Sequence, residues 1–186
     1  MQKIPTLFRR DPENLKRVLN EVNPGCEWVL AGEGVATRKF DGTCVRLDDD
    51  GRWFARREVR PGKAAPENFV AVMTDPTTGK TVGWEPVEQS GFARWHAAAL
   101  SESGDTPAPG TYELCGPKVN GNPEGYESHV LVAHDTAPTA VELDYPITFE
   151  DARDAVLALK AEGVEGIVWH HPDGRMAKLK GRDFPA

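Results

Sequence analysis

Five short segments combine amine, guanidinium and carboxylate side chains of the kinds that handle phosphate groups. In chain order they are KFDG at 39–42, ARREVR at 55–60, YELCG at 112–116, EGIVW at 165–169 and KLK at 178–180. An uncharged lysine amine is a nucleophile, an arginine fork binds phosphate or ribose oxygens, and carboxylates bind divalent cations. Each segment alone is weakly specific, since Asp-Gly is a common turn and surface strands often carry lysine. All five in this order are far more specific.

The first half of the chain is predicted to contain one helix followed by a meander of strands. Asp11 and Pro12 are typical of an N-cap and a first helical position, which predicts a helix over 11–22. Strands are predicted at 28–31, 35–40, 43–47 and 53–58, with a hairpin turn at 49–51. The segment 60–83, rich in Pro, Gly, Thr and Lys, is predicted to be mostly loop.

The second half alternates helices with short strands. Helices are predicted at 90–101 and from Thr148 to about 162, where Thr148 and Asp151 form a capping box and Gly163 ends the helix. Strands are predicted at 111–115 and 129–134, and a hairpin at 166–179 turns at Pro172-Asp173-Gly174. The expected class is therefore α+β, with mainly antiparallel sheets and flanking helices, in a single domain over 1–186.

Composition excludes several classes of protein. With 39% hydrophobic and 27% charged residues and no long apolar run, the 186-residue chain is expected to be soluble, without a membrane span. No apolar secretory segment follows the N-terminus, so a cytoplasmic location is expected. Three cysteines without CxxC spacing favour neither a disulfide framework nor a zinc site.

The five segments together resemble the covalent nucleotidyltransferase superfamily of DNA ligases, RNA ligases and mRNA capping enzymes. KFDG matches its KxDG element, and Cys44 stands where DNA ligases commonly carry arginine. ELCGPKVNGNPEG and EGIVWHHPDG are similar to the small ATP-dependent RNA ligases typified by the vertebrate 5′ to 3′ RNA ligase. The resemblance covers nearly the whole chain and implies an ATP-grasp-like ligase adenylyltransferase domain, here with no appended OB-fold or C-terminal domain.

By this resemblance, the protein is an enzyme that joins RNA ends with ATP and Mg²⁺ or Mn²⁺. A lysyl-AMP forms, AMP passes to a 5′-phosphate RNA end, and a 3′-hydroxyl then attacks that end. The nucleophilic lysine must be neutral although its ordinary pKa is about 10.4, so nearby positive charge or desolvation has to lower this pKa. A monomeric protein acting in RNA repair is expected.

The resemblance also implies roles for individual residues. Lys39 is the nucleophile, Asp41 orients the loop and a metal-bound water, and Gly42 allows close backbone approach. Glu113 binds ribose and Glu165 the metal. The full implied set is Lys39, Lys178 and Lys180 for catalysis, Asp41, Gly42, Arg56, Arg60, Glu113 and Val168 for the nucleotide, and Glu165, Glu113 and Asp41 for the metal.

Several alternatives remain open at this stage. Lys39 can be a surface lysine, Asp41 an ordinary turn residue, and Arg57 competes with Arg56 and Arg60 as the nucleotide-binding arginine. A capping-type nucleotidyltransferase with another acceptor, or a noncatalytic RNA-end binder, would carry the same segments. ATP and GTP are not distinguished. The net charge of −7 counts against tight nonspecific RNA binding, although 38–63 holds eight basic residues against five acidic ones.

Overall fold

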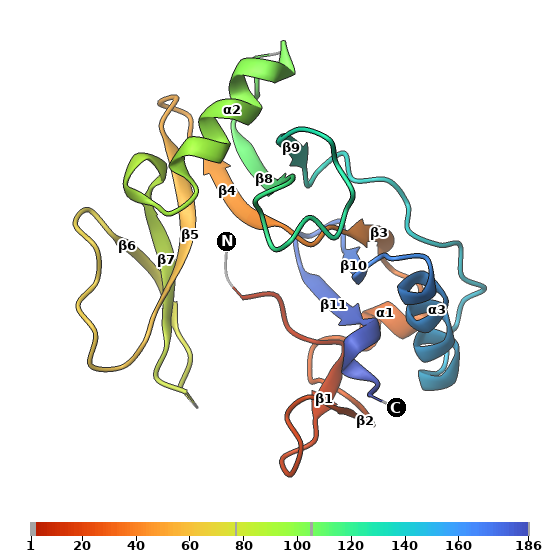
Figure 1. The fold of residues 1–186 in the computed structure, drawn as a ribbon. Coiled ribbons are helices and arrows are strands. Elements are labelled where there is room, and N and C mark those ends of the chain that lie inside the picture. Colours follow the sequence, from red (N-terminus) through yellow and green to blue (C-terminus); the bar gives the residue numbers. More distant parts are fainter. Residues whose placement is uncertain (1–2, 77, 105, 186) are drawn as a thin grey trace. The chain divides into compact units, whose positions relative to one another are not determined.

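The protein has an α+β fold in which the named strands pair antiparallel (Figure 1). The computed structural model describes residues 3–76, 78–104 and 106–185. The chain forms two compact units, which we call unit 1 (residues 1–3 and 41–136) and unit 2 (residues 4–40 and 137–186). The fold class predicted from sequence is confirmed, whereas the single domain and the ATP-grasp-like character stay predictions. The boundary after Phe40 divides the KFDG segment between the units.

Unit 1 is built on a six-stranded sheet. Its elements are β4 (Thr43–Leu47), β5 (Trp53–Val59), β6 (Val70–Thr74), β7 (Thr81–Pro86), η1 (Val87–Gln89), α2 (Ala93–Ser103), β8 (Gly110–Cys115) and β9 (Val130–Ala133). The strand order is β6-β7-β5-β4-β8-β9. One face packs on α2 and η1, because Val45, Ala55 and Leu114 form a buried cluster with Val87 and Ala99. Sheet alternation leaves the opposite face to polar and aromatic side chains.

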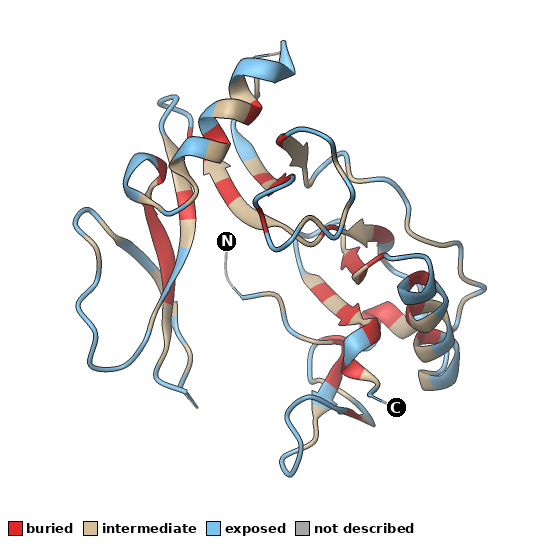
Figure 2. Cartoon of the chain, in the orientation of Figure 1, coloured by how far each residue is buried: buried red, intermediate tan, exposed pale blue. Residues whose placement is uncertain are grey.

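Unit 2 contains the remaining elements. They are β1 (Phe8–Arg10), β2 (Val18–Val22), α1 (Glu27–Ala31), β3 (Val35–Lys39), α3 (Phe149–Ala161), β10 (Gly166–His170), β11 (Met176–Lys180) and η2 (Gly181–Asp183). A three-stranded sheet has the order β11-β10-β3, and β1 pairs with β2. Ile167, Trp169 and Leu179, each fully buried, pack against Val156 of α3. Figure 2 shows the resulting alternation of buried and partly exposed residues along β11.

Several local predictions are confirmed. The strands at 43–47 and 53–58 form the predicted hairpin, and the pairing of Val45 with Ala55 fixes its register. The Thr148 side chain accepts from the Asp151 N–H at 3.2 Å, and the Asp151 carboxylate accepts from the Thr148 N–H at 2.8 Å, which is the expected capping box. The terminal hairpin pairs Gly166 with Lys180.

The predicted helix over 11–22 is wrong, because β1 and β2 form a hairpin there, with Phe8 opposite Val22. The Asp11 side chain accepts from the Glu13 N–H at 2.9 Å and thus stabilises a turn instead of a helix N-terminus. Leu15, which lies within the predicted helix, is 70% exposed at this turn. Long-range pairing has overridden the local helical pattern.

The predicted strand at 28–31 is also wrong, because α1 occupies this segment. A run of four apolar residues does not distinguish a strand from a short buried helix. Trp28 and Val29 are consecutive residues and both are buried. Consecutive side chains of a strand point to opposite faces, so burial of both in one core favours a helix. Gly32, with φ of 81°, ends the helix in the left-handed region.

The predicted loop over 60–83 contains β6 and the start of β7. Glycine weakens the strand signal here, since Gly83 lies inside β7. A Cβ at this position would collide with the Val70 carbonyl oxygen and the Phe69 ring, so glycine permits β6 to pack closely. The described residues contain no helix long and apolar enough to cross a membrane.

Candidate functional site

Lys39 is the last residue of β3, and pairing within the three-stranded sheet sets its neighbours. Gly166 of β10 lies opposite both Lys39 and Lys180. Residues that pair across antiparallel strands share a face, so Lys39 and Lys180 project from the same side of the sheet. Lys178 lies two residues before Lys180 on that face, whereas Leu179 is fully buried on the other.

Gly166 explains how the two lysine-bearing strands approach the same glutamate. A Cβ on Gly166 would collide with the Leu179 carbonyl oxygen, and it would lie 2.8 Å from the Lys180 Cα. Glycine therefore permits β10 and β11 to pair closely at this point. Glu165, the preceding residue, is thereby held between the ends of β3 and β11.

Glu165 binds three cationic side chains, and we call Lys39, Glu165, Lys180 and Arg182 the Glu165 cluster. Its Oε2 is 2.5 Å from the Lys39 Nζ, while its Oε1 is 2.5 Å from the Lys180 Nζ and 3.2 Å from the Arg182 Nη2. The carboxylate side chain is only 7% exposed, against 19% for Lys39 and 12% for Lys180. A nearly buried carboxylate is thus compensated by two nearly buried ammonium groups.

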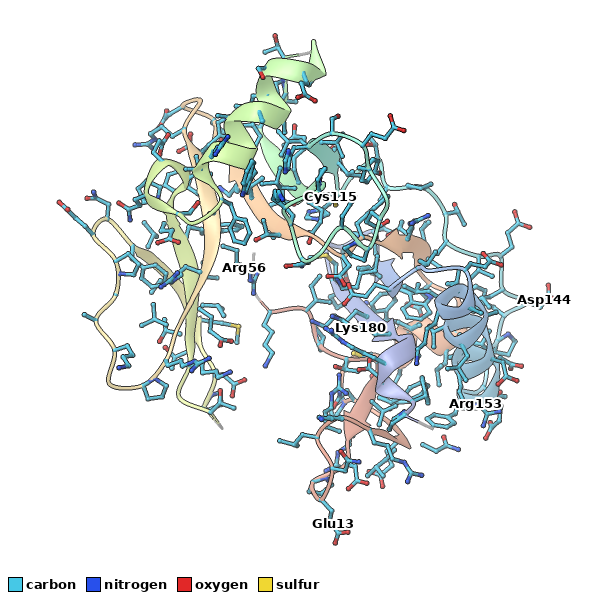
Figure 3. All side chains as sticks on the ribbon, in the orientation of Figure 1. Glu13, Arg56, Cys115, Asp144, Arg153 and Lys180 are labelled. Atoms are coloured by element: carbon cyan, nitrogen blue, oxygen red, sulfur yellow. The ribbon has the colours of Figure 1, made fainter. Side chains whose placement is uncertain are left out.

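Charge and burial shift the pKa values within the Glu165 cluster. Burial alone would raise the pKa of Glu165, but the ammonium groups of Lys39 and Lys180 outweigh burial and hold this pKa below its ordinary value. The pKa of Lys180 is lowered by desolvation first and by the charge of Lys39 second, with Glu165 opposing both. Burial and Lys39 therefore disfavour the charged form of Lys180 (Figure 3), whereas Glu165 favours it.

Val168 and Lys178 extend the same sheet face away from the cluster. Val168 pairs with both Lys178 and Thr37, and its carbonyl oxygen accepts from the Thr37 hydroxyl at 3.0 Å. Val168 is buried, and Lys178 is partly exposed. Val168 therefore lies between Thr37 and Lys178 on the face that carries Lys39 and Lys180.

In unit 1, Glu113 fixes the Asp-Gly half of the KFDG segment. Its Oε1 accepts from the Gly42 N–H at 3.1 Å, and its Oε2 is 3.0 Å from the His134 Nε2. The His134 Nδ1 lies 3.0 Å from the Thr111 hydroxyl. A Cβ on Gly42 would collide with the Leu114 carbonyl oxygen, so only glycine permits this approach to β8. Both oxygens of Glu113 are thus oriented.

Asp41 is anchored by the loop that follows β8. Its N–H donates to the Glu124 carboxylate at 2.9 Å, and its Oδ1 accepts from the Asn120 amide at 3.1 Å. The same amide donates to the Gly42 carbonyl at 2.7 Å. Asn120 has a φ of 48°, a backbone region that asparagine tolerates better than most residues. This loop therefore orients the Asp-Gly pair.

The register of β8, β4 and β5 separates the candidate arginines. Arg56 (Figure 3) lies on the sheet face that carries Glu113. Arg57 lies on the opposite face, with its Nη1 3.9 Å from the buried Glu85. Arg60 is one residue beyond the end of β5. Of the two candidate arginines within β5, Arg56 is thus the one on the face that carries Glu113, a face that Arg46 of β4 also shares.

The predicted site residues fall into two groups. Unit 2 brings together Lys39, Glu165 and Lys180, and unit 1 brings together Asp41, Gly42 and Glu113. Arg182 and His134 were not predicted, although both make direct contacts to predicted residues. Arg182 was detectable as the next cation after KLK, whereas a histidine 21 residues from Glu113 carries no local signal.

Glu165 is the carboxylate of the unit 2 group, and both of its oxygens already contact cationic side chains. Among the described residues, no three His, Cys, Asp or Glu side chains gather as a protein metal cage. Mg²⁺ is commonly held by one or two carboxylates together with substrate phosphates and water, a role open to Glu165. Asp183 is already engaged, since it accepts from the Arg10 guanidinium at 2.6 Å and the Lys180 N–H at 3.0 Å.

No protein-family model matches the chain. The chain is similar to two curated proteins, each named RNA ligase 1. The protein from Danio rerio is 39% identical over 79 residues, which cover 37% of this chain and 22% of that protein. The protein from Mus musculus is 28% identical over 163 residues, which cover 68% of this chain and 45% of that protein. The chain thus spans less than half the length of either relative.

Proposed function

We propose that this chain is an ATP-dependent RNA ligase that forms a covalent lysyl-AMP intermediate at Lys39. The observation that carries the proposal is the Glu165 cluster, in which a nearly buried lysine amine, a second lysine and an arginine converge on one carboxylate. Three cationic side chains contact this one carboxylate, in a chain of net charge −7. Similarity to proteins named RNA ligase 1 supports RNA as the acceptor.

The first step is attack of the Lys39 Nζ on the α-phosphorus of ATP. An ammonium has no lone pair, so Lys39 must leave its ion pair with Glu165 and release a proton to solvent. The N–P bond forms, the bond from the α-phosphorus to the bridging oxygen breaks, and pyrophosphate departs. A second amine proton is lost to solvent as the phosphoramidate forms. Lys180 stabilises negative charge that develops on the phosphate oxygens.

Two further groups support nucleotide binding in this proposal. A divalent cation held by Glu165 would add positive charge at the phosphates when bound. In unit 1, Glu113 would accept a hydrogen bond from a ribose hydroxyl, and Arg56 on the same sheet face would bind ribose or phosphate oxygens. Within unit 1, Glu113 and Asn120 also fix the backbone of Gly42.

The remaining steps transfer AMP to RNA and seal the ends. An oxygen of the RNA 5′-phosphate attacks the phosphorus of lysyl-AMP and forms a phosphoanhydride as the N–P bond breaks. The Lys39 nitrogen regains from solvent the two protons that it lost in the first step. The 3′-hydroxyl of the second end then attacks the 5′-phosphate, loses its proton, forms the phosphodiester and expels AMP. Both later bonds form at phosphorus, so Lys180 can stabilise the developing negative charge in all three steps.

The proposal is tested by intact-mass measurement after incubation with ATP and Mg²⁺. We expect the wild-type chain to gain the mass of one AMP, and Lys39→Ala to gain none. Lys16→Ala, which changes an exposed lysine in the β1–β2 turn, is the matched control and should react like the wild type. Wild-type protein without added mass, or Lys39→Ala with it, would contradict the proposal.

A chase identifies the acceptor. Labelled lysyl-AMP protein is mixed with 5′-phosphorylated RNA that also carries a 3′-hydroxyl, and the products are separated by length. Transfer of label to RNA followed by joining supports ligation. If the label stays on the protein when RNA is added but moves to another acceptor when that acceptor is added, the result would instead indicate a capping-type or other nucleotidyltransferase.

A further inference from the structure

Arg182 is the outermost cation of the Glu165 cluster. It lies in η2, directly after β11, and its side chain is 68% exposed, against 12% for Lys180 and 19% for Lys39. Its Nη2 lies 3.2 Å from the Glu165 Oε1. The same oxygen already contacts the Lys180 Nζ at 2.5 Å. The Glu165 charge is therefore compensated without Arg182.

A contribution to stability does not account for this arginine. A single contact from a largely exposed side chain contributes little to folding free energy. Arg182 also adds positive charge next to Lys180, whose pKa is already lowered by burial and by Lys39. A guanidinium offers five N–H donors in a rigid fork, which matches two oxygens of a phosphate. A phosphate can accept from two donors of this fork, whereas the contact with the Glu165 carboxylate uses Nη2.

The two oxygens of Glu165 define a direction across the cluster. The nucleophile Lys39 is at Oε2, whereas Lys180 and Arg182 are at Oε1. In-line displacement at phosphorus sends the leaving group away from the attacking atom. If the α-phosphate lies between Lys39 and Lys180, the leaving group departs toward the side that carries Arg182, the most exposed cation of the cluster.

Building on the proposed function, we propose that Arg182 binds the β- and γ-phosphates of ATP, which leave as pyrophosphate when Lys39 attacks. Arg182 exchanges its contact with Glu165 for phosphate oxygens. Its role is confined to the step that involves pyrophosphate and does not extend to the RNA steps. This separation makes the assignment testable with substrates that contain or lack the pyrophosphate group.

The experiment compares wild type, Arg182→Ala, Arg182→Lys and the control Arg9→Ala in the full chain. Arg9 is a 58% exposed arginine of the same unit with one carboxylate partner, Glu21, at 2.8 Å. Three rates are measured: lysine adenylylation against ATP concentration, loss of AMP from lysyl-AMP protein driven by added pyrophosphate, and sealing of RNA that has been adenylylated beforehand. Circular dichroism confirms that each variant is folded.

For Arg182→Ala we expect the KM for ATP to rise about tenfold, and likewise the pyrophosphate concentration for half-maximal reversal. A tenfold change corresponds to the loss of one charge-assisted hydrogen bond. Sealing of pre-adenylylated RNA should stay unchanged. Arg182→Lys should recover part of the loss, and Arg9→Ala should match wild type. An unchanged pyrophosphate response, or an equal loss of sealing, would overturn the assignment. Wild-type protein that takes up no nucleotide would overturn the proposed function itself.

Discussion

Removing the charge of Glu165 is the sharpest test of the cluster as a physical unit. Glu165→Gln keeps the size and one acceptor oxygen but leaves the amines of Lys39 and Lys180 beside a neutral group. Both amines are more than four-fifths buried, with side-chain exposures of 19% and 12%. The substitution thus creates two uncompensated charges near each other in a poorly solvated place.

The expected cost is about 2–4 kcal/mol in the free energy of unfolding near neutral pH. Breaking a fully buried ion pair by removing one partner costs about 3–5 kcal/mol. The lower end of our range allows for the partial exposure of the lysines, and the upper end reflects the loss of two ion pairs from a single carboxylate. Arg182 contributes little, since its side chain is 68% exposed.

The deficit should depend on pH in both directions. The pKa of Glu165 in the folded protein is below its ordinary value of 4.5, so its contribution is complete above that value and is lost as pH falls through the folded pKa. The wild type therefore loses this advantage in acid.

The pKa of folded Lys180 is below 10.5, so the unfolded chain binds more protons between these two values and stability rises with pH there. Without Glu165, which raises this pKa, that window extends toward neutral pH and the deficit shrinks in alkali.

The assay is urea unfolding followed by circular dichroism across the pH range, with Glu162→Gln as control. Glu162 is exposed at the end of α3 in the same unit, so its substitution should change stability by less than about 0.5 kcal/mol. Equal stability of the two variants near neutral pH, or a Glu165→Gln deficit that is the same at all pH values, would refute the electrostatic account.

Two other substitutions test how the site is positioned. Gly166→Ala forces a Cβ into the Leu179 carbonyl and should destabilise the protein by about 3 kcal/mol. The control Gly91→Ala places its Cβ in open space and should leave stability unchanged. Equal urea midpoints for the two variants would contradict the close-approach argument. His134→Ala removes a partner of Glu113 and should raise the KM for ATP in lysine labelling about fivefold with little change in stability, as expected for one hydrogen bond. An unchanged KM would show that His134 does not position Glu113.

Local sequence determined those elements whose signals lie within a few residues of one another. The hairpin of β4 and β5 follows from alternating strands around an Asp-Asp-Gly turn, and α3 follows from an apolar helical face behind the Thr148 capping box. The alternation in KLK also placed Lys178 and Lys180 on one face with Leu179 on the other. In these segments, local preference and burial agree.

Tertiary structure decided the segments where these influences compete. The residues 11–22 have helical spacing, but pairing with β1 and the turn at Asp11 make a hairpin. The apolar run in α1 satisfies helix and strand patterns equally, and the core that buries Trp28 with Val29 selects the helix. Gly83 weakens the strand pattern of β7, and the reason for a glycine there is its close packing against β6, which the local sequence does not show.

The site depends on both levels. Sequence supplied the types of the reacting groups, namely a lysine before Asp-Gly, a glutamate before Gly166 and paired lysines near the C-terminal end. Only strand pairing shows that Lys39 and Lys180 both lie opposite Gly166, which brings two amines and Arg182 to one carboxylate. Ion pairs between residues far apart in sequence depend on sheet register, which is set by long-range packing and leaves no local signal.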